Sequence, residues 1–329
     1  MKEITRRRKY EIKQRAKGGK LVVLSLFDGI SGAQIALKEL GIVPAKYFAS
    51  EVLKKAIRVT SQNFAETEQV GDITKWQEWL PDILGKYTVD LVVCSSPCQN
   101  FSKRGLDGDK LKLFLVALEI LEYIEDKQKK PFYFLFDGDP ANPGLGNYLS
   151  TNAVLIDNAV FDAGHRNRLY FTNIAARFNV DLFDNDYCYS EIPSLTDVRP
   201  RPFPFDKNPS GDLFLSEKQL AYCFKCQEPF KNGDKSPFLI LKNEIPKCIT
   251  TKVNNRLGGN LVAMKCAKAN SYKGLGYSFR RLTVNELKLC NGIPEWYSFG
   301  NYSYSSICEL IGNGFGIGTI KYILNHIIK

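Results

Sequence analysis

Short apolar runs alternate with amphipathic segments over the first half of the chain, and this alternation limits the possible folds more than any other feature. The apolar runs occupy residues 21–27, 46–50, 89–95, 131–136, 153–157 and 168–172. Segments with apolar residues three and four positions apart fill the intervals 30–40, 53–63, 76–84 and 111–126. The runs have the length of strands and the intervals have the length and period of helices. Strands that alternate with helices predict an open, mostly parallel α/β sheet.

The sequence changes in character near residue 176. From 176 to 302 Pro, Asn, Lys and Gly are frequent and no long helical period is present, which predicts a smaller, irregular, partly β domain. A helical period returns at 303–329, and we expect this segment to pack back onto the first domain, residues 20–175. Residues 1–19, which precede the first apolar run, are predicted to be a separate basic arm.

Positive charge is concentrated at the N-terminus. The 329 residues carry a net charge of +10, and residues 1–20 supply +7 of it with nine basic and two acidic side chains. We expect 1–19 to be a solvated basic helix or arm that ends at Gly18–Gly19 and contacts the phosphates of a polyanionic partner. Its removal is then expected to weaken binding and flatten the salt dependence without changing sequence preference.

Several classes of protein are disfavoured by composition. No apolar run approaches the roughly 20 residues that a membrane span requires, and the charged N-terminus has no apolar signal region. The nine cysteines are scattered and odd in number, so we expect an intracellular, reducing environment. His165 and His326 are the only histidines. Cys223 and Cys226 have no second pair at suitable spacing, and no metal is expected.

The first apolar run ends in a glycine-containing turn that leads into a helical segment. The turn reads Phe27-Asp28-Gly29-Ile30-Ser31-Gly32. Glycines at a strand-to-helix turn let a ligand approach the backbone closely. Glu51 ends the next run, where an acidic side chain can bind ribose hydroxyls, and Asp72 is placed to accept from an adenine amino group. The dinucleotide fingerprint is incomplete, so two interpretations stay open. The turn either binds an adenosine-type ligand at this edge of the sheet or is a glycine turn without any ligand.

A cysteine follows the run at 89–95. The sequence Ser95-Ser96-Pro97-Cys98-Gln99-Asn100-Phe101-Ser102 places Cys98 at the carboxyl end of a predicted strand, where open α/β sheets bind ligands. Cys98 is either a nucleophile or a buried, inert thiol. The polar, glycine-containing segment 103–110 that follows has the composition of a mobile lid.

Two arginines stand at the start of the run at 168–172. Arg166 and Arg168 are two residues apart, so their side chains lie on the same face of a strand. Their guanidinium groups can donate to a base carbonyl or a phosphate. A solvated strand end explains the pair equally well when it is taken alone.

In their order and spacing, these three motifs resemble those of the cytosine-5 DNA methyltransferases. The turn at 27–32 is similar to the family's cofactor motif, Pro97–Gln99 to its Pro-Cys loop, and Arg166 with Arg168 to its Arg-x-Arg motif. Near the C-terminus, 281–283 and 311–314 are similar to its last two motifs. The resemblance runs from about residue 20 to the end and is nearest to the animal de novo branch. It implies a Rossmann-like methyltransferase fold with a target-recognition domain.

The resemblance also implies S-adenosyl-L-methionine as the cofactor and S-adenosyl-L-homocysteine as its product. The residues that it implies for cofactor binding are Phe27, Asp28, Gly29, Ser31, Gly32, Glu51, Val52, Asp72, Ile73, Pro97, Asn313 and Phe315. Within this set, Glu51 would bind the ribose hydroxyls, Asp72 with Ile73 would hold the adenine, and Asn313 would close the site.

The implied substrate is a cytosine flipped out of duplex DNA. Cys98 would add to C6 and make C5 the nucleophile, Arg168 would bind the base carbonyl, and Arg166 would support the loop. The residues expected to contact DNA are Gln99, Ser102, Lys103 and Arg104 beside the cysteine, and Lys252, Asn254 and Arg256 in the second domain. Lys252 and Arg256 can donate to guanine or to phosphate. Self-association is a further possibility that the sequence does not decide.

The chain departs from the family where the fifth strand should end in Glu-Asn-Val. Here the sequence reads Asp137-Gly138-Asp139-Pro140. The family glutamate binds cytosine N3 and the exocyclic amine, and Asp137 is one methylene shorter. Three explanations are compatible with this departure. In the first, Asp137 or Asp139 replaces the glutamate on a shifted backbone. In the second, the enzyme acts on an altered base or group, and in the third the protein binds DNA with impaired catalysis. We favour replacement by Asp137. A tRNA substrate is the other alternative, because one branch of the family methylates tRNA.

Overall fold

The computed structural model describes residues 4–95, 108–138, 153–174, 203–225, 245–250, 260–267 and 276–328, with the short pieces 140, 149, 151, 194–195, 239–241 and 273. Within these residues, no helix has both the length and the apolar character that crossing a bilayer requires.

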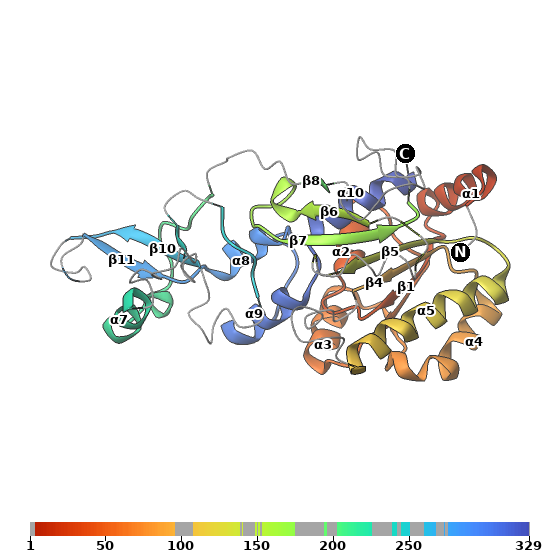
Figure 1. The fold of residues 1–329 in the computed structure, drawn as a ribbon, viewed down its shortest axis with the longest axis horizontal. Helices are drawn as coiled ribbons and strands as arrows, with labels where there is room; N and C mark the ends of the chain where they lie inside the picture. Colours follow the sequence, from red (N-terminus) through yellow and green to blue (C-terminus); the bar gives the residue numbers. More distant parts are fainter. Residues whose placement is uncertain are drawn as a thin grey trace.

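An eight-stranded sheet forms the centre of the molecule, with the strand order β3-β2-β1-β4-β5-β7-β6-β8 (Figure 1). Its strands are β1 (Val22–Leu26), β2 (Lys46–Ser50), β3 (Glu68–Gln69), β4 (Leu91–Cys94), β5 (Tyr133–Gly138), β6 (Ala153–Asp157), β7 (Asn167–Thr172) and β8 (Ser194–Leu195). The first five strands run parallel, and β7 runs antiparallel to both β5 and β6. The predicted, mostly parallel α/β sheet is confirmed.

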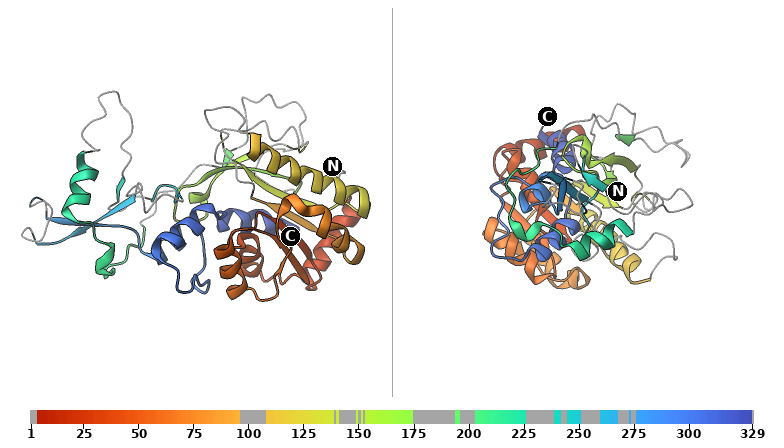
Figure 2. Two further views of the ribbon diagram at one scale, coloured as in Figure 1. Left: turned by 90° about the horizontal axis from the view of Figure 1, so that it is seen from below. Right: turned by 90° about the vertical axis from the view of Figure 1, so that its left-hand side faces the viewer.

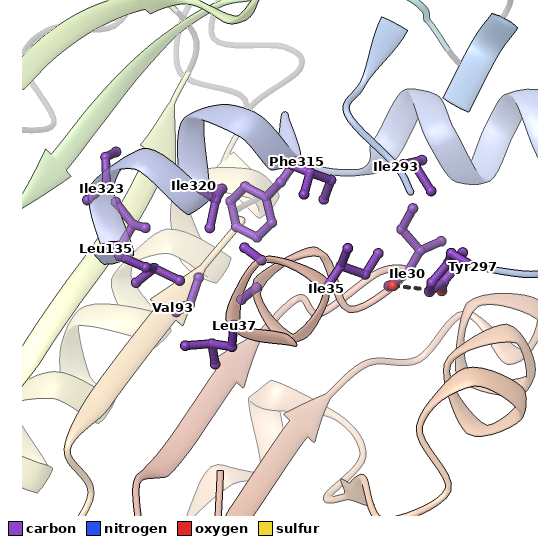
Figure 3. Close-up of a cluster of buried hydrophobic side chains, with 14 of the residues drawn as sticks. Ile30, Ile35, Leu37, Val93, Leu135, Ile293, Tyr297, Phe315, Ile320 and Ile323 are labelled. Atoms are coloured by element: carbon purple, nitrogen blue, oxygen red, sulfur yellow. Dashed lines mark hydrogen bonds between the residues drawn. The ribbon is translucent and has the colours of Figure 1, made fainter. Parts of the chain in front are cut away.

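Helices cover both faces of the sheet. They are α2 (Gly32–Glu39), α3 (Lys54–Asn63), α4 (Trp76–Lys86), α5 (Gly108–Gln128), α8 (Val284–Cys290), α9 (Tyr304–Asn313) and α10 (Ile317–Ile328). One face packs against α2 and α10, as Figure 3 shows for Val93 and Leu135. The other face packs against α4 and α5 through residues such as Val92 and Phe134. Alternate residues of each strand therefore enter two separate cores, as expected for strands buried on both sides.

The basic N-terminal segment forms helix α1 (Arg6–Lys17), but one side of this helix is buried. Ile12 and Ala16 belong to the core that α10 covers, and Arg8 is only 6% exposed. The expectation of a solvated helix is corrected, because apolar residues and Arg8 form a stripe along α1 that contacts the body of the protein. Only the opposite side of α1, which includes Arg7 and Lys17, is exposed.

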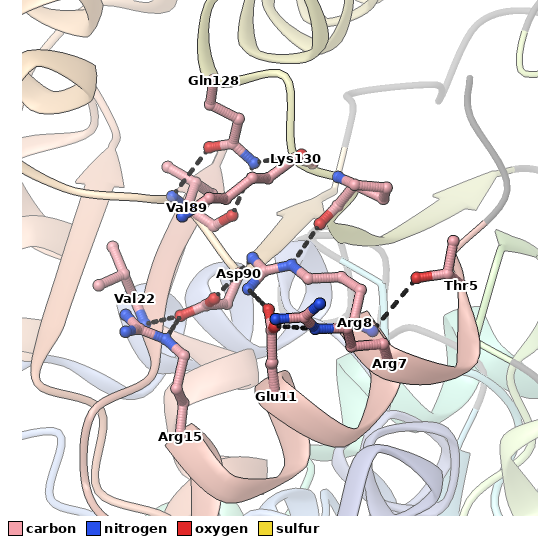
Figure 4. Close-up of polar contacts among 11 residues, drawn as sticks. Thr5, Arg7, Arg8, Glu11, Arg15, Val22, Val89, Asp90, Gln128 and Lys130 are labelled. Carbon is pink, nitrogen blue, oxygen red and sulfur yellow. Dashed lines mark hydrogen bonds and ion pairs between the residues drawn. The ribbon is translucent and has the colours of Figure 1, made fainter.

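The buried carboxylate of Asp90 holds α1 in place (Figure 4). Its Oδ1 accepts from Arg8 Nη2 at 2.9 Å, and its Oδ2 accepts from Arg15 Nε at 2.8 Å and from the Val22 backbone N–H at 3.0 Å. Asp90 immediately precedes β4, so these bonds attach α1 to the amino-terminal edge of the sheet. That edge is opposite to the one at which parallel strands bind ligands.

A smaller unit lies at one end of the molecule (Figures 1 and 2). It contains helix α7 (Glu217–Lys225) and a three-stranded sheet of β9 (Leu239–Leu241), β10 (Asn260–Lys265) and β11 (Tyr277–Arg280). This unit falls within residues 176–302, the segment for which the sequence predicts a second, irregular domain.

A buried ion pair joins the last strand of the smaller unit, β11, to helix α8. Arg280 donates to both carboxylate oxygens of Glu286, at 2.7 and 2.8 Å, and Glu286 also completes the capping box of α8 with Thr283. Tyr297 donates to the Ile30 carbonyl at 2.7 Å, and the Ser298 N–H donates to Asn63 Oδ1 at 2.8 Å, so this stretch already contacts α3 and the turn after β1. The chain therefore returns to the main unit before residue 303, the boundary expected from the sequence.

Candidate active site

A cavity of about 490 Å³ opens at the carboxyl ends of the parallel strands. Its walls come from the segments that follow β1, β2, β3, β4 and β5, from the start of β7, and from α9. The lining residues are Phe27, Gly29, Ser50, Glu51, Val52, Leu53, Ala56, Asp72, Ile73, Thr74, Ser95, Leu113, Asp137, Arg166, Arg168, Leu310 and Asn313. A cavity of this size with apolar walls and a few polar groups is typical of a small-molecule site.

The turn after β1 has an unusual backbone conformation. Phe27, Gly29 and Ser31 have φ values of 55°, 57° and 60°, in the left-handed region that non-glycine residues rarely occupy. Gly32 packs so closely that an added Cβ would lie 3.1 Å from atoms of Phe315 and Ile317. Phe27 and Gly29 of this turn line the cavity, whereas Asp28 and the segment 30–32 are buried behind it.

Glu51 is held rigidly at the rim of the cavity. Its Oε2 accepts from the Gly29 N–H at 2.7 Å, and its Oε1 accepts from the N–H groups of Val52 and Leu53 at 2.7 and 2.8 Å. Oε2 has a single partner among the described residues, and a carboxylate oxygen can accept two hydrogen bonds. Glu51 is therefore oriented in advance and retains the capacity to accept from a ligand.

Asp72 and Ile73 form the wall after β3. Asp72 Oδ1 accepts from the backbone N–H and the hydroxyl of Thr74, both at 2.8 Å, and so caps the short 3₁₀ helix Ile73–Lys75. The carboxyl group is thereby fixed beside the cavity, while Ile73 is buried and supplies an apolar surface.

Seven of the predicted cofactor residues line the cavity: Phe27, Gly29, Glu51, Val52, Asp72, Ile73 and Asn313. Four others are absent from its walls and are buried behind them: Asp28, Ser31, Gly32 and Phe315. Their positions follow from the turn, in which Asp28 points inward and accepts from the Tyr47 hydroxyl at 2.8 Å.

Asp28 is a buried carboxyl whose Oδ2 has no partner among the described residues. Burial raises the pKa of Asp28 to about 6, although hydrogen bonds from Ser25, Tyr47 and Ser31 act in the opposite direction. In the unfolded chain the group ionises near its usual pKa of 3.8. Its stabilising effect is therefore complete below pH 3.8 and is lost as the pH rises through 6.

Asp28→Asn is expected to increase the free energy of unfolding at pH 8, by up to about 3 kcal/mol, because the ionised carboxylate is removed from the interior. The gain should roughly halve at pH 5, where the wild-type group is mostly protonated. Urea unfolding at both pH values measures this difference. Asp82→Asn, on the exposed side of α4, is the control and should change neither value. Equal effects of Asp28→Asn at pH 5 and pH 8 would contradict the assignment.

Asp137 faces two arginines at the opposite end of the cavity. It pairs across the β5–β7 ladder with Tyr170, and Arg166, Arg168 and Tyr170 alternate along the same face of β7. Burial raises the pKa of Asp137, whereas the charges of Arg168 and Arg166 and a hydrogen bond from the Ser95 side chain lower it. The structure thus brings together three of the predicted catalytic residues.

Arg166 is buried and connects three segments. Its Nη2 donates to the Gly314 carbonyl at 2.8 Å, and its Nη1 lies 3.4 Å from the Gly312 carbonyl and 3.7 Å from Cys248 Sγ. These contacts fix the turn that carries Asn313. Arg168 is more exposed and donates through Nη1 to the Asn167 carbonyl at 2.8 Å.

The remaining predicted site residues lie outside the described part of the chain. They are Pro97, Cys98, Gln99, Ser102, Lys103, Arg104, Lys252, Asn254 and Arg256, together with the alternative carboxylate Asp139. Ser95 and Thr250 are the nearest described residues to the two segments. The roles of all these residues stay predictions.

Seven lining residues were not predicted as site residues: Ser50, Leu53, Ala56, Thr74, Ser95, Leu113 and Leu310. Ser95 belongs to the cysteine motif, but the motif alone gives it no role. Leu310 and Leu113 are apolar helix residues whose spacing does not distinguish a cavity wall from a core position. For Ser95 a signal was present, because strand alternation places it on the same face as Val93, toward Asp137.

The mostly parallel α/β fold with a small second unit is that of DNMT2-like methyltransferases. DNMT2 of Spodoptera frugiperda superimposes with a TM-score of 0.69 at 20% identity, over 94% of this chain and all of that chain. A putative DNA modification methyltransferase encoded in an Escherichia coli prophage gives a TM-score of 0.55 at 17% identity. At these identities the likeness establishes the fold alone.

Sequence relatives define the family. Residues 21–137 match the C-5 cytosine-specific DNA methylases. The orphan methyltransferase M.SPRI of Bacillus phage SPR is 32% identical over 288 residues, which span 79% of this chain and 62% of the phage protein. DRM2 of Arabidopsis thaliana, named a DNA (cytosine-5)-methyltransferase, is 30% identical over 32% of this chain and 19% of its own length. Residues 21–137 therefore carry a C-5 cytosine-specific DNA methylase domain, and the relatives that match the chain are named as methyltransferases.

A further relative carries a different substrate in its name. The tRNA (cytosine(38)-C(5))-methyltransferase of Spodoptera frugiperda is 31% identical over 108 residues, 32% of each chain. These three relatives are a phage, a plant and an insect protein, so the predicted closeness to the animal de novo branch stays a prediction. The chain spans about three fifths of M.SPRI and a smaller share of the other two.

S-adenosyl-L-methionine is the methyl donor of this family, and the cavity fits it. Glu51 presents an oriented carboxylate for hydroxyl groups, and Phe27 and Ile73 supply apolar walls for an aromatic base. Among the described residues no group of three or more His, Cys, Asp and Glu side chains could hold a metal ion.

Proposed function

We propose that the chain transfers a methyl group to C5 of cytosine in duplex DNA. The observation that carries the proposal is the arrangement of the cavity. Glu51 and Asp72 line one part of it, and Asp137, Arg166 and Arg168 meet at another. A nucleoside-type donor and a pyrimidine base therefore have separate sets of polar partners within one connected space.

In the proposed complex the donor lies along the carboxyl ends of β1, β2 and β3. Glu51 accepts from the ribose hydroxyls, Asp72 and Ile73 contact the adenine, and Phe27 packs on the ring. When bound, the donor supplies an electrophilic methyl group. Asn313, held by Arg166 through the carbonyls of its neighbours, closes the cavity from α9.

The cytosine occupies the part of the cavity beside β5 and β7. The Cys98 thiolate adds to C6, and the electron pair displaced toward C5 makes that carbon the nucleophile. Arg168 donates to the base carbonyl. Burial raises the pKa of Asp137, which favours the protonated carboxyl that can share a proton with N3 and so increase the electrophilicity of C6. After methyl transfer, loss of the C5 proton lets the thiolate leave.

A tRNA substrate is the second candidate. It is favoured by the tRNA methyltransferase among the relatives, whereas the description of the family and the name of DRM2 favour DNA. In the proposed DNA complex, Lys252, Asn254 and Arg256 contact the duplex, and Gln99, Ser102, Lys103 and Arg104 surround the flipped base. Exposed charges on α1 add contacts to phosphate.

The two candidates are separated by parallel assays with a tritiated methyl donor on duplex DNA and on unmodified tRNA. Label is expected in DNA, and bisulfite sequencing of that DNA should show protected cytosines in one sequence context. Label in tRNA alone would replace DNA with tRNA as the substrate. Tight binding of DNA and donor without label in either nucleic acid would favour a binding protein with impaired catalysis.

Asp137→Asn is expected to lower kcat about 100-fold, because the amide cannot share a proton with N3. Asp137→Glu restores the family side chain but moves the carboxyl group by one methylene. We expect it to keep no more than about a tenth of wild-type kcat, since the surrounding residues fit aspartate. Single-turnover assays with saturating donor measure both. Full activity of Asp137→Asn would exclude Asp137 from the proton transfer.

A further inference from the structure

Ser95 and Asp137 lie side by side at the carboxyl ends of β4 and β5. The strand register pairs Val93 with Leu135 and Cys94 with Phe136, and one further step places Ser95 next to Asp137. Val93 and Leu135 both belong to the core on the α2 and α10 face. Because side chains alternate along a strand, Ser95 and Asp137 point to this same face. Both residues line the cavity.

Ser95 presents a hydroxyl to the Asp137 carboxyl, and this hydroxyl lowers the pKa of Asp137. Ser95 is itself fixed, because its backbone N–H donates to the Leu26 carbonyl at 3.1 Å. Among the described residues, Arg166, Arg168 and Tyr170, at the start of β7 and along it, also lie near Asp137. Ser95 therefore approaches the Asp137 carboxyl from the β4 side, and the two arginines approach it from the β7 side.

We propose that Ser95 is a positioning residue for Asp137, and that its hydroxyl holds the shorter carboxyl in the place of the longer family glutamate. The proposal rests on the proposed function of Asp137. A carboxyl drawn only by Arg166 and Arg168 would turn toward β7 and away from the base. A hydroxyl donor just after β4 balances this pull and keeps the carboxyl directed toward the base.

The position of Ser95 in the chain adds a second consequence. Ser95 stands three residues before Cys98, so its hydrogen bond attaches the start of the segment that carries the nucleophile to the carboxyl group. A displacement of about 1 Å between reacting groups can cost on the order of 100-fold in rate.

Direct titration of Asp137 tests the hydrogen bond without requiring turnover. In protein labelled with ¹³C-carboxyl aspartate, the resonance that disappears in Asp137→Asn identifies Asp137. Ser95→Ala removes a donor that stabilises the carboxylate, so the midpoint should rise by about 0.5 to 1 pH unit. A merely structural role predicts the opposite shift, because a loosened site admits water and lowers the pKa. An unchanged or lowered midpoint would overturn the proposal.

Kinetics test whether the hydrogen bond affects catalysis. Ser95→Ala is expected to lower kcat on the order of 10-fold with the donor KM unchanged, and Ser95→Thr, which keeps the hydroxyl, should retain most of the activity. In the Asp137→Glu background, Ser95→Ala should lower kcat by less than about 3-fold, because the longer side chain places its carboxyl elsewhere. Equal losses in both backgrounds, or no rescue by threonine, would count against positioning.

Ser25→Ala is the matched control. Ser25 is a buried serine on the same face of the neighbouring strand β1, and its side chain lowers the pKa of Asp28 instead. It should leave the Asp137 midpoint unchanged. A wild-type protein that methylates neither DNA nor RNA would refute the proposed function, and the titration would still decide whether Ser95 holds Asp137.

Discussion

Cys98→Ala is expected to abolish methyl transfer, with a loss of at least about 1,000-fold in kcat, and to abolish covalent trapping of DNA that contains 5-fluorocytosine. The reaction requires a bond to C6 before C5 can attack the methyl group, and alanine cannot form it. With fluorine at C5 there is no proton to remove, so the adduct with a thiolate persists. Denaturing gels and mass spectrometry of the conjugate read out the trapping.

Cys248→Ala is the control for this prediction, because Cys248 has a thiol close to the proposed catalytic residues, 3.7 Å from Arg166 Nη1. It should retain trapping and most of the activity. The buried thiols do not compete as nucleophiles, since burial raises the pKa of Cys308 to about 11 and that of Cys290 still further. Trapping that survives in Cys98→Ala and is lost in Cys248→Ala would reassign the nucleophile.

Six of the eight strands in the main sheet were predictable because each is an apolar run with clear ends, whereas β3 and β8 are two-residue strands without such a run. The run at 46–50 coincides with β2, and those at 153–157 and 168–172 correspond to β6 and β7. The antiparallel direction of β7 was not predictable in the same way, because apolar periodicity contains no information on strand direction. The short connection between β6 and β7, which suits antiparallel neighbours, was the available signal.

Helix α1 shows how a strong charge signal can hide a weaker packing signal. Ile4, Arg8, Ile12 and Ala16 recur every four residues and form the buried stripe of this region. The net charge of residues 1–20 favoured a solvated arm, and one arginine in the stripe concealed its amphipathic character. Arg8 is compatible with burial because Asp90, more than 80 positions away in the sequence, accepts from it.

The site was predictable by motif but not by orientation. The motif at 27–32 located the turn, yet the left-handed conformation of Phe27 and Ser31 decides which side chains face the cavity. Asp28 and Ser31 therefore point into the core, and Phe27 and Gly29 face the cavity. The contact between Ser95 and Asp137 depends on the register of two strands about 40 residues apart, which no local pattern specifies.

Asp90→Ala is expected to lower the free energy of unfolding by about 3–5 kcal/mol, the second large effect that the structure predicts. The substitution removes the buried acceptor of Arg8 Nη2 and of the Val22 N–H, and it releases Arg15, while Arg8 keeps only the Pro131 carbonyl and the partly exposed Glu11. A buried N–H donor without an acceptor lowers the free energy of unfolding by more than its hydrogen bond had contributed. Chemical denaturation at low and high salt measures the loss, which should depend little on salt because the carboxylate is buried.

Arg7→Ala on the same helix is the matched control. The Arg7 side chain is 90% exposed and pairs with Glu11 across one turn, an interaction worth less than about 0.5 kcal/mol. A loss in Asp90→Ala no greater than in Arg7→Ala would show that the network does not hold α1.

The attachment of α1 to Asp90 also determines how contacts between α1 and phosphate can be tested. Deleting residues 1–19 would strip Asp90 of both arginines and uncover the core, so a weaker salt dependence of binding would have to be sought in substitutions of Arg6, Arg7 and Lys17 on the exposed side.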